Sequence, residues 1–177
     1  LFPSFWFTGL SGVGKTTLAN SAKEFFVQKG QRVLVLDGDN VRRELHRQLG
    51  FSPSDIKENN HLIAKLCQKH RSGTDIIFVP IISPYLESRR IARNMLLPGF
   101  YEIHLDADMD TLCKRDTKGL YKLAQKGEMK NLIGFSAENV YEPPIQPDLY
   151  LDTSSISVEV TKNTFTEFVD SKINIKR

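Results

Sequence analysis

The fold of this chain is decided by the stretch Gly9-Leu10-Ser11-Gly12-Val13-Gly14-Lys15-Thr16. It fits the pattern G-x-x-x-x-G-K-[ST], a glycine-rich loop that holds phosphate groups. An apolar run over residues 4–8 precedes it and a helical pattern follows, which is the strand–loop–helix context that this motif requires. The loop N–H groups and the helix N-terminus can bind an anion. We therefore predict a nucleotide-binding protein, the alternative being a glycine turn that binds nothing.

Each residue type in this loop suggests a part of the nucleotide site. Lys15 is expected to reach the β- and γ-phosphates of ATP, and the hydroxyl of Thr16 to bind Mg²⁺, the predicted cofactor. The loop residues expected to bind ATP are Gly9, Ser11, Gly12, Val13, Gly14, Lys15, Thr16 and Thr17.

Composition and charge are typical of a single globular domain. The chain has 177 residues, of which 40% are hydrophobic and 25% charged, with a net charge of +3. We predict one domain over residues 1–177. The charge is small and no dense Lys/Arg run occurs, so nucleic acid is not an expected partner. No apolar run is long enough for a membrane span, so no membrane association is expected.

The cysteines and histidines do not suggest a metal site. Cys67 and Cys113 are isolated thiols without a CxxC motif, and each is expected to be a small buried hydrophobic residue. The four histidines show no metal-ligand spacing with them, so we expect no structural zinc. The start at Leu1 lacks the charged leader of a signal peptide, and together these features favour a cytoplasmic location.

Apolar runs alternate with helical patterns along the whole chain. The expected strands are residues 4–8, 32–37, 75–82, 101–106 and 149–152, and the expected helices are residues 15–29, 41–49, 54–71, 86–97, 109–115 and 157–169. Uniformly apolar strands between helices indicate a three-layer α/β/α fold with a five-stranded, mainly parallel sheet. The polar, Gly- and Lys-rich segment 117–147 interrupts the alternation and is expected to be a mobile lid over the site.

Acidic residues follow the second expected strand. Ligands of such sheets bind at the C-terminal ends of the strands, and the third strand carries no acid there. We therefore predict that Asp39 orients the acceptor hydroxyl and helps to hold Mg²⁺, with Asp37 in support. The alternative is an Asp-Gly turn in which Asp39 or Asn40 caps the helix that begins at Val41, and capping is compatible with catalysis.

Two groups of cations accompany these acids. Arg42 and Arg43 could hold an anionic substrate beside Asp39, or they could be solvated surface charges. From Lys118 to Lys130 a lysine recurs every four residues, which on a helix would form one stripe. Such a stripe is either a solvated face or a set of cations that close over phosphates.

Motifs spread along the chain resemble those of the adenylylsulfate kinase family of P-loop kinases. The similar stretches, in the family's order, are residues 9–17, 36–42 (LDGDNVR), 49–52 (LGFS), 58–59 (EN), 82–85 (ISPY), 115–122 (RDTKGLYK), 126–130 (KGEMK) and 141–144 (YEPP). The resemblance implies a kinase of sulfate assimilation that transfers the γ-phosphate of ATP to the ribose 3′-hydroxyl of adenosine 5′-phosphosulfate (APS). It also implies a homodimer.

The resemblance further assigns residues to each part of the site. It puts Arg115 at the nucleotide end, Asp39 at Mg²⁺ and the acceptor hydroxyl, and Phe51 on the acceptor base. The residues implied in acceptor binding are Asp37, Asp39, Arg42, Phe51, Asn59, Ile82, Ser83, Lys118, Leu120 and Lys130, and those implied in catalysis are Lys15, Asp39 and Ser83. Ser83 matches a serine proposed in the family as a phosphorylated intermediate. No neighbouring base in the sequence would activate it, so contact with the acceptor is preferred.

The chain departs from the family on the acceptor side. Ile56 replaces the arginine expected to hold the sulfate end, and His61, Leu62 and Leu86 replace three further arginines, while the stretch 136–140 runs about two residues longer than the family pattern. Losing one cation from a buried anion site costs about 2–5 kcal/mol, which Arg43 could offset.

These departures leave two alternatives to APS phosphorylation. One is phosphorylation of the same hydroxyl on another nucleotide-linked acceptor such as cytidine diphosphoramidate, for which relatives in capsule synthesis offer a precedent. The other is a nucleotide-binding regulatory module without catalysis. A GTPase is disfavoured, because residues 117–120 lack the aspartate that would read guanine.

Overall fold

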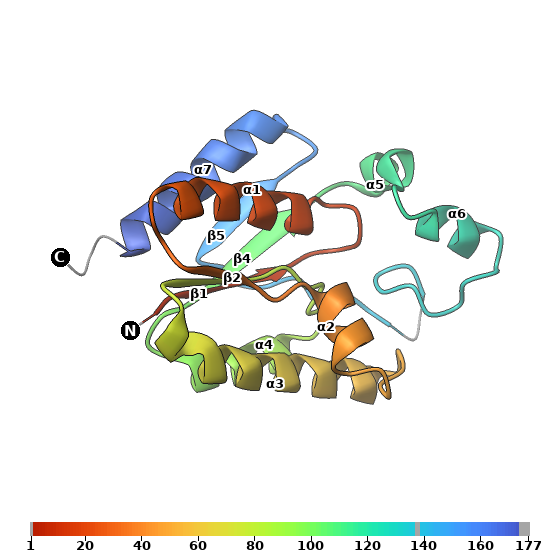
Figure 1. Ribbon diagram of the computed structural model, residues 1–177. Coiled ribbons are helices and arrows are strands. Elements are labelled where there is room, and N and C mark those ends of the chain that lie inside the picture. Colours follow the sequence, from red (N-terminus) through yellow and green to blue (C-terminus); the bar gives the residue numbers. More distant parts are fainter. Residues whose placement is uncertain (1, 137–138, 174–177) are drawn as a thin grey trace.

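The computed structural model describes residues 2–136 and 139–173 and has the predicted three-layer α/β/α architecture (Figure 1). The strands are β1 (Ser4–Thr8), β2 (Val33–Val35), β3 (Ile76–Val79), β4 (Phe100–Asp106) and β5 (Leu149–Asp152). The helices are α1 (Lys15–Gln28), α2 (Gly38–Glu44), α3 (Pro53–His70), α4 (Leu86–Leu96), α5 (Met109–Arg115), α6 (Leu120–Gln125) and α7 (Val158–Ile173), with a short 3₁₀ turn η1 (Arg71–Gly73). The sheet order is β2-β3-β1-β4-β5 and every pairing is parallel, so the predicted fold class is confirmed.

Strand β1 runs through the centre of the sheet and is buried on both faces. Phe5 and Phe7 face the layer of α1 and α7, whereas Trp6 faces the layer of α3 and α4 (Figure 1). Successive side chains of a strand point to opposite faces, so a continuous apolar run suits a sheet that is covered twice. The C-terminal end of β1 is thereby fixed, and the phosphate-binding loop leaves the sheet from that end.

Two strands are shorter than the sequence predicts. The expected strand 75–82 forms ladder pairs only over Ile76–Val79, because Pro80 has no N–H to donate. The expected strand 32–37 is reduced to Val33–Val35. The residues that leave the two ladders, Asp37 and the segment 80–84, line a cavity at this edge of the sheet.

Helix α2 begins three residues earlier than predicted. Its cap is Asp37, whose carboxylate accepts the N–H groups of Asp39 at 3.1 Å and of Asn40 at 3.3 Å. The expectation that Asp39 or Asn40 caps a helix beginning at Val41 is therefore wrong. Because Asp37 takes the capping position, the carboxylate of Asp39 remains available for other contacts.

The segment 117–147 carries structure of its own. It contains α6, whose Tyr121 is buried in the main core and donates a hydrogen bond from its hydroxyl to the carbonyl of Ser11 at 2.8 Å. Within the set of lysines, only Lys122 lies on α6, so the predicted single stripe is wrong. The mobility of this segment stays a prediction, and Ala137 and Glu138 of the longer stretch 136–140 lie outside the described residues.

The two cysteines differ in their surroundings. Cys67 is fully buried, as predicted, and burial raises the pKa of its thiol to about 12. Cys113 is only half-buried, at the margin of the main core. Among the residues that the structure describes, no helix combines the length and the apolar character needed to cross a membrane.

We predict that the aromatic cluster on β1, β3 and α7 provides much of the stability. Phe78 is fully buried, with its ring 5.6 Å from those of both Phe5 and Phe165. Phe78→Ala should lower the free energy of unfolding by about 3–5 kcal/mol through lost burial and the cavity left behind. The control Phe25→Ala removes a ring that is 38% exposed and should cost clearly less. Urea unfolding measures both, and equal losses would contradict the assignment of this core.

Candidate active site

A cavity of about 430 Å³ opens at the C-terminal edge of the sheet. It is lined by the phosphate-binding loop, the starts of α2, α3 and α7, the segment 80–84, and Thr117 and Lys118 of the predicted lid, residues 117–147. Of the residues predicted from the sequence, those that line it are Ser11, Gly12, Val13, Gly14, Lys15, Thr16, Thr17, Asp37, Asp39, Arg42, Phe51, Asn59, Ile82, Ser83, Arg115 and Lys118. Residues that lie up to about a hundred positions apart in the sequence thus line one cavity.

The phosphate-binding loop has the backbone shape that its glycines permit. Gly14 caps α1 in the left-handed conformation (φ 98°). Gly9 has φ 146°, and a Cβ there would lie 2.2 Å from the carbonyl oxygen of Leu105. Only glycine fits such a position. The loop therefore passes close to β4 and presents the N-terminus of α1 to the cavity, which suits an anion.

Lys15 is folded back onto this loop. Its ammonium group donates to the carbonyls of Gly9 at 2.8 Å and Leu10 at 2.7 Å, and the residue is 8% exposed. Burial, with a smaller contribution from the nearby charge of Lys118, lowers the pKa of Lys15 from 10.5 to about 7, while Asp39 and Asp37 oppose the shift. A phosphate group in the loop would favour the protonated form.

Thr16 and Asp37 form a pair beside the loop. The Thr16 hydroxyl donates to Oδ2 of Asp37 at 2.8 Å, while Oδ1 of the same carboxylate caps α2. A hydroxyl and a carboxylate oxygen are ligand types that Mg²⁺ prefers, so these residues fit that ion. Within the described residues no group of three or more His, Cys, Asp or Glu side chains converges on one point. A magnesium ion here would therefore need phosphate and water oxygens as further ligands, as it does in kinases.

Asp39 faces the lid. Its side chain is 73% exposed and forms an ion pair with Lys118. Arg43, the neighbouring cation, instead donates to the side-chain oxygen of Asn40 at 2.7 Å and is exposed. The structure therefore brings Asp39 and one lid lysine together across the mouth of the cavity, and it directs Arg43 elsewhere.

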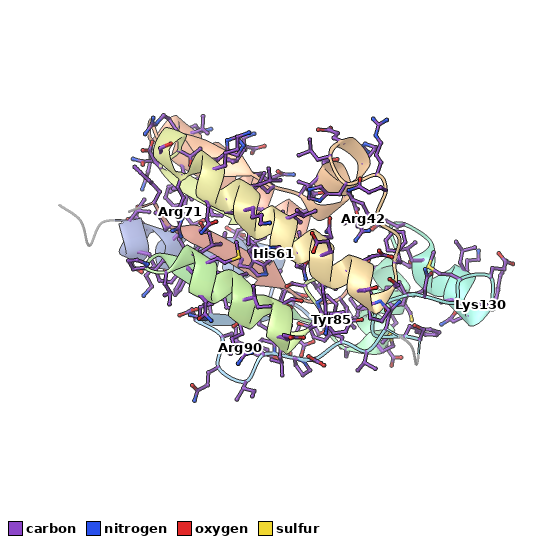
Figure 2. All side chains as sticks on the ribbon, turned by 90° about the horizontal axis from the view of Figure 1, so that it is seen from below. Arg42, His61, Arg71, Tyr85, Arg90 and Lys130 are labelled. Atoms are coloured by element: carbon purple, nitrogen blue, oxygen red, sulfur yellow. The ribbon has the colours of Figure 1, made fainter. Side chains whose placement is uncertain are left out.

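Arg42 and Phe51 form the outer wall of the opposite half. The guanidinium of Arg42 lies 4.6 Å from the centre of the Phe51 ring and donates to the carbonyls of Leu49, at 3.1 Å, and Gly50. Burial is the main cause that lowers the pKa of Arg42. Figure 2 shows Arg42 between α2 and the N-terminal end of α3. Together the two side chains offer a flat surface on which a base could stack.

Ser83 lies at the bottom of the cavity in a strained conformation. It has φ 44° and is 2% exposed, and its hydroxyl accepts hydrogen bonds from Trp6 Nε1 at 3.0 Å and Asn60 Nδ2 at 3.3 Å. Its carbonyl accepts from Arg89 Nη1 at 2.6 Å. Strained residues of this kind occur mostly at functional sites. Among the described residues no carboxylate or imidazole contacts the Ser83 hydroxyl, so the geometry favours a contact role over a nucleophilic one.

Three predicted residues lie outside the cavity lining. Gly9, the first residue of the loop, lies against the carbonyl of Leu105, and Leu120 packs against the main core. Lys130 is exposed and lies out on the lid, away from α3 and α4 (Figure 2). The binding roles of these residues stay predictions.

The end of the cavity around Arg115 was only partly predicted. Arg115 donates from Nη1 to the hydroxyl of Thr153 at 2.9 Å and from Nη2 to its carbonyl at 2.5 Å. Beside this pair the cavity is lined by Ile156, Val158 and Lys162. These residues follow β5, the last strand of the chain, whose C-terminal end lies at the same edge of the sheet. Extending the same rule to the last strand would have found them.

Known proteins resemble this chain over nearly its whole length. The family model described as adenylylsulphate kinase matches residues 3–152. The adenylyl-sulfate kinase of Bacillus pumilus is 41% identical over 168 residues, which cover 94% of this chain and 84% of the relative. The structure of the Mycobacterium tuberculosis APS kinase CysC in complex with AMPPNP and APS has a TM-score of 0.89 at 32% identity, covering 96% of this chain and 98% of that chain. A hexameric APS kinase from Thiobacillus denitrificans has a TM-score of 0.67 at 27% identity, with 96% of this chain and 29% of that chain covered.

The lowered pKa of Lys15 predicts that nucleotide binding takes up a proton. Below pH 7 the free protein already holds Lys15 protonated, and above pH 7 it does not. A bound triphosphate favours the charged form, so affinity for Mg-ATP should fall as pH rises above 7, by up to about tenfold per pH unit.

Calorimetry in buffers of different ionisation enthalpy measures this uptake. The control Lys15→Arg keeps its charge at every pH and should bind without taking up a proton. The same pH dependence in both proteins would contradict the assignment to Lys15.

Proposed function

The chain belongs to the adenylylsulphate kinase family, and we propose that it transfers the γ-phosphate of ATP to the ribose 3′-hydroxyl of adenosine 5′-phosphosulfate. One observation carries the proposal: the phosphate-binding loop, the two aspartates of the second strand's end and the Arg42–Phe51 wall all line the same cavity. A donor site, a proton acceptor and a base-stacking surface are what this transfer needs.

The donor half holds ATP through the loop. Its N–H groups and the N-terminus of α1 bind the phosphates, and Lys15 exchanges the carbonyls of Gly9 and Leu10 for β- and γ-phosphate oxygens. Thr16, with Asp37 beside it, would hold Mg²⁺, and the part of Asp39 in holding this ion stays a prediction. When bound, this ion supplies positive charge that offsets the charge developing on the phosphate oxygens. The adenine of ATP lies at the end of the cavity that is lined by Arg115 and the start of α7.

The acceptor half presents the sugar hydroxyl to Asp39. The acceptor base stacks on Phe51. Once the Asp39–Lys118 ion pair has opened, Asp39 accepts a hydrogen bond from the 3′-hydroxyl. The hydroxyl oxygen forms a bond to the γ-phosphorus while the bond to the β–γ bridging oxygen breaks, and the hydroxyl proton passes to Asp39. ADP leaves with the electron pair of the broken bond. During the transfer, Lys118 is released from Asp39 and faces the phosphoryl group.

We also propose that the chain forms a single catalytic domain. Both core clusters pack on a single sheet, which supports one catalytic domain with a lid over residues 117–147. ATP and a nucleotide acceptor are then its small-molecule partners. The predicted homodimer and cytoplasmic location stay predictions.

Ile56 favours a second candidate for the acceptor. Its buried side chain lines the cavity at the position where the family arginine is expected. An apolar wall there suits an acceptor whose terminal group carries less negative charge than sulfate, such as cytidine diphosphoramidate.

The two acceptors can be distinguished by incubating the protein with Mg-ATP and each acceptor in turn and measuring the ADP that forms. Turnover with APS supports the first proposal, turnover with the cytidine compound alone supports the second, and tight ATP binding without any turnover would support a regulatory module.

Lys15 and Asp39 should be needed for different reasons. Lys15→Ala should lower kcat by at least about a hundredfold, because phosphate charge loses its stabilisation in the transition state. Asp39→Asn should lower kcat with little change in thermal stability, because the exposed carboxylate contributes to the fold mainly through a surface ion pair. ADP release and melting temperature measure both effects. Near-normal turnover in either variant would remove that residue from the proposed mechanism.

Ile56 offers a test of acceptor choice. If APS is used poorly for want of a cation, Ile56→Arg should lower the KM for APS by about tenfold or more, since a buried hydrogen-bonded charge pair is worth at least about 2 kcal/mol. Ile56→Met, which keeps an apolar side chain of similar volume, is the matched control. An unchanged or higher KM for APS in a folded Ile56→Arg protein would show that this wall does not face the sulfate.

A further inference from the structure

We propose that His46 is a positioning residue for the acceptor, because its imidazole holds the side-chain amide of Asn59 with the amide nitrogen turned toward the acceptor nucleotide. This inference rests on the proposed function, since it concerns the acceptor half of the same cavity. No role for His46 follows from the sequence alone.

The two side chains meet across the turn between α2 and α3. Nδ1 of His46 lies 2.8 Å from Oδ1 of Asn59, and each residue is only 6% exposed. The backbone of His46 is fixed as well, since its N–H donates to the carbonyl of Val41 at 3.2 Å and its carbonyl accepts from Leu49 at 3.1 Å. The imidazole therefore approaches Asn59 from a rigid turn, and solvent has little access to compete for the bond.

This contact determines which end of the amide faces the cavity. Asn59 lines the cavity, and because its Oδ1 is bound to His46, Nδ2 is the amide atom left to contact a ligand. Among residues 2–136 and 139–173 this nitrogen donates no hydrogen bond, and it is not one of the fully buried atoms that lack a partner, so a ligand could reach it. The neighbouring amide, Asn60, already donates to Ser83. The Nδ2 group of Asn59 can therefore still donate a hydrogen bond to a nucleotide bound in the acceptor half of the cavity.

Histidine suits this task because of its chemistry. Nδ1 carries a proton in the imidazolium and in one neutral tautomer, and an Nδ1–H group can pair only with the oxygen of an amide. Without such a partner the side-chain amide of Asn59 could rotate by about 180° and present its carbonyl oxygen to the cavity. A phosphorylated nucleotide offers many acceptor oxygens, so a donor in this position contributes to binding and a carbonyl would repel them.

Two substitutions at His46 separate the donor from the bulk of the ring. His46→Leu fills similar space without a donor and should raise the KM for APS by about three- to tenfold, the usual range for one neutral hydrogen bond. His46→Asn places Nδ2 where Nδ1 stood and should restore the wild-type value. The KM for Mg-ATP should stay unchanged in both variants, because His46 does not line the cavity and lies on the acceptor side.

A double-mutant cycle shows whether His46 acts through Asn59. In Asn59→Ala protein, the further change His46→Leu should leave the KM for APS unchanged, because the amide it orients is gone. If His46→Leu raises the KM for both substrates equally, or has its full effect without Asn59, the proposal is wrong. Wild-type protein that does not turn over APS would contradict the proposed function instead, and the cycle is then run with the acceptor that does support turnover.

The tautomer of His46 provides a readout that does not depend on activity. In the neutral form of the ring, ¹⁵N NMR should show the proton on Nδ1. A proton on Nε2 would mean that Nδ1 accepts from the amide, which reverses the orientation of Asn59 and overturns the proposal.

Discussion

The burial of the Lys15 side chain against backbone carbonyls is the constraint on which the rest of this structure depends. An ammonium group at 8% exposure is costly unless hydrogen-bonded, and two loop carbonyls provide those bonds. They can do so only because the glycines turn the loop back over the end of β1, close to β4. The aromatic residues of β1 fix that strand between two helical layers. The packing of the core therefore sets the shape of the phosphate site.

Three cations around the cavity, Lys15, Arg42 and Lys118, bind oxygens of the chain itself. Lys15 and Arg42 donate to carbonyls, and Lys118 pairs with Asp39. Each bond can be exchanged for one to a substrate oxygen without moving the backbone that carries the residue. Such exchange keeps the cost of reorganisation low, which is how preorganised sites stabilise developing charge. In the proposed mechanism it also links the two halves of the reaction, because Lys118 moves from Asp39 to the phosphates as Asp39 binds the acceptor hydroxyl.

The phosphate site could be predicted from the sequence because its determinants are local. The loop of residues 9–16 specifies its own backbone shape, and the apolar runs specify a doubly covered parallel sheet. The first residue of α2 could not be predicted in this way, because it depends on which of two nearby aspartates turns its carboxylate back onto the helix. The Asp39–Lys118 pair joins residues 79 positions apart, and the contact of His46 with Asn59 depends on how two helices meet. Neither follows from spacing along the chain.

The account requires that the acceptor hydroxyl lie between Asp39 and the γ-phosphate. A crystal structure of the protein with Mg²⁺, a non-hydrolysable ATP analogue and adenosine 5′-phosphosulfate tests this most directly. We expect the 3′-oxygen within about 3 Å of the Asp39 carboxylate and in line with the bond to the leaving oxygen, with Lys118 moved onto the phosphates. An acceptor bound with its sugar turned away from Asp39, while the Asp39–Lys118 pair stays closed, would contradict the account.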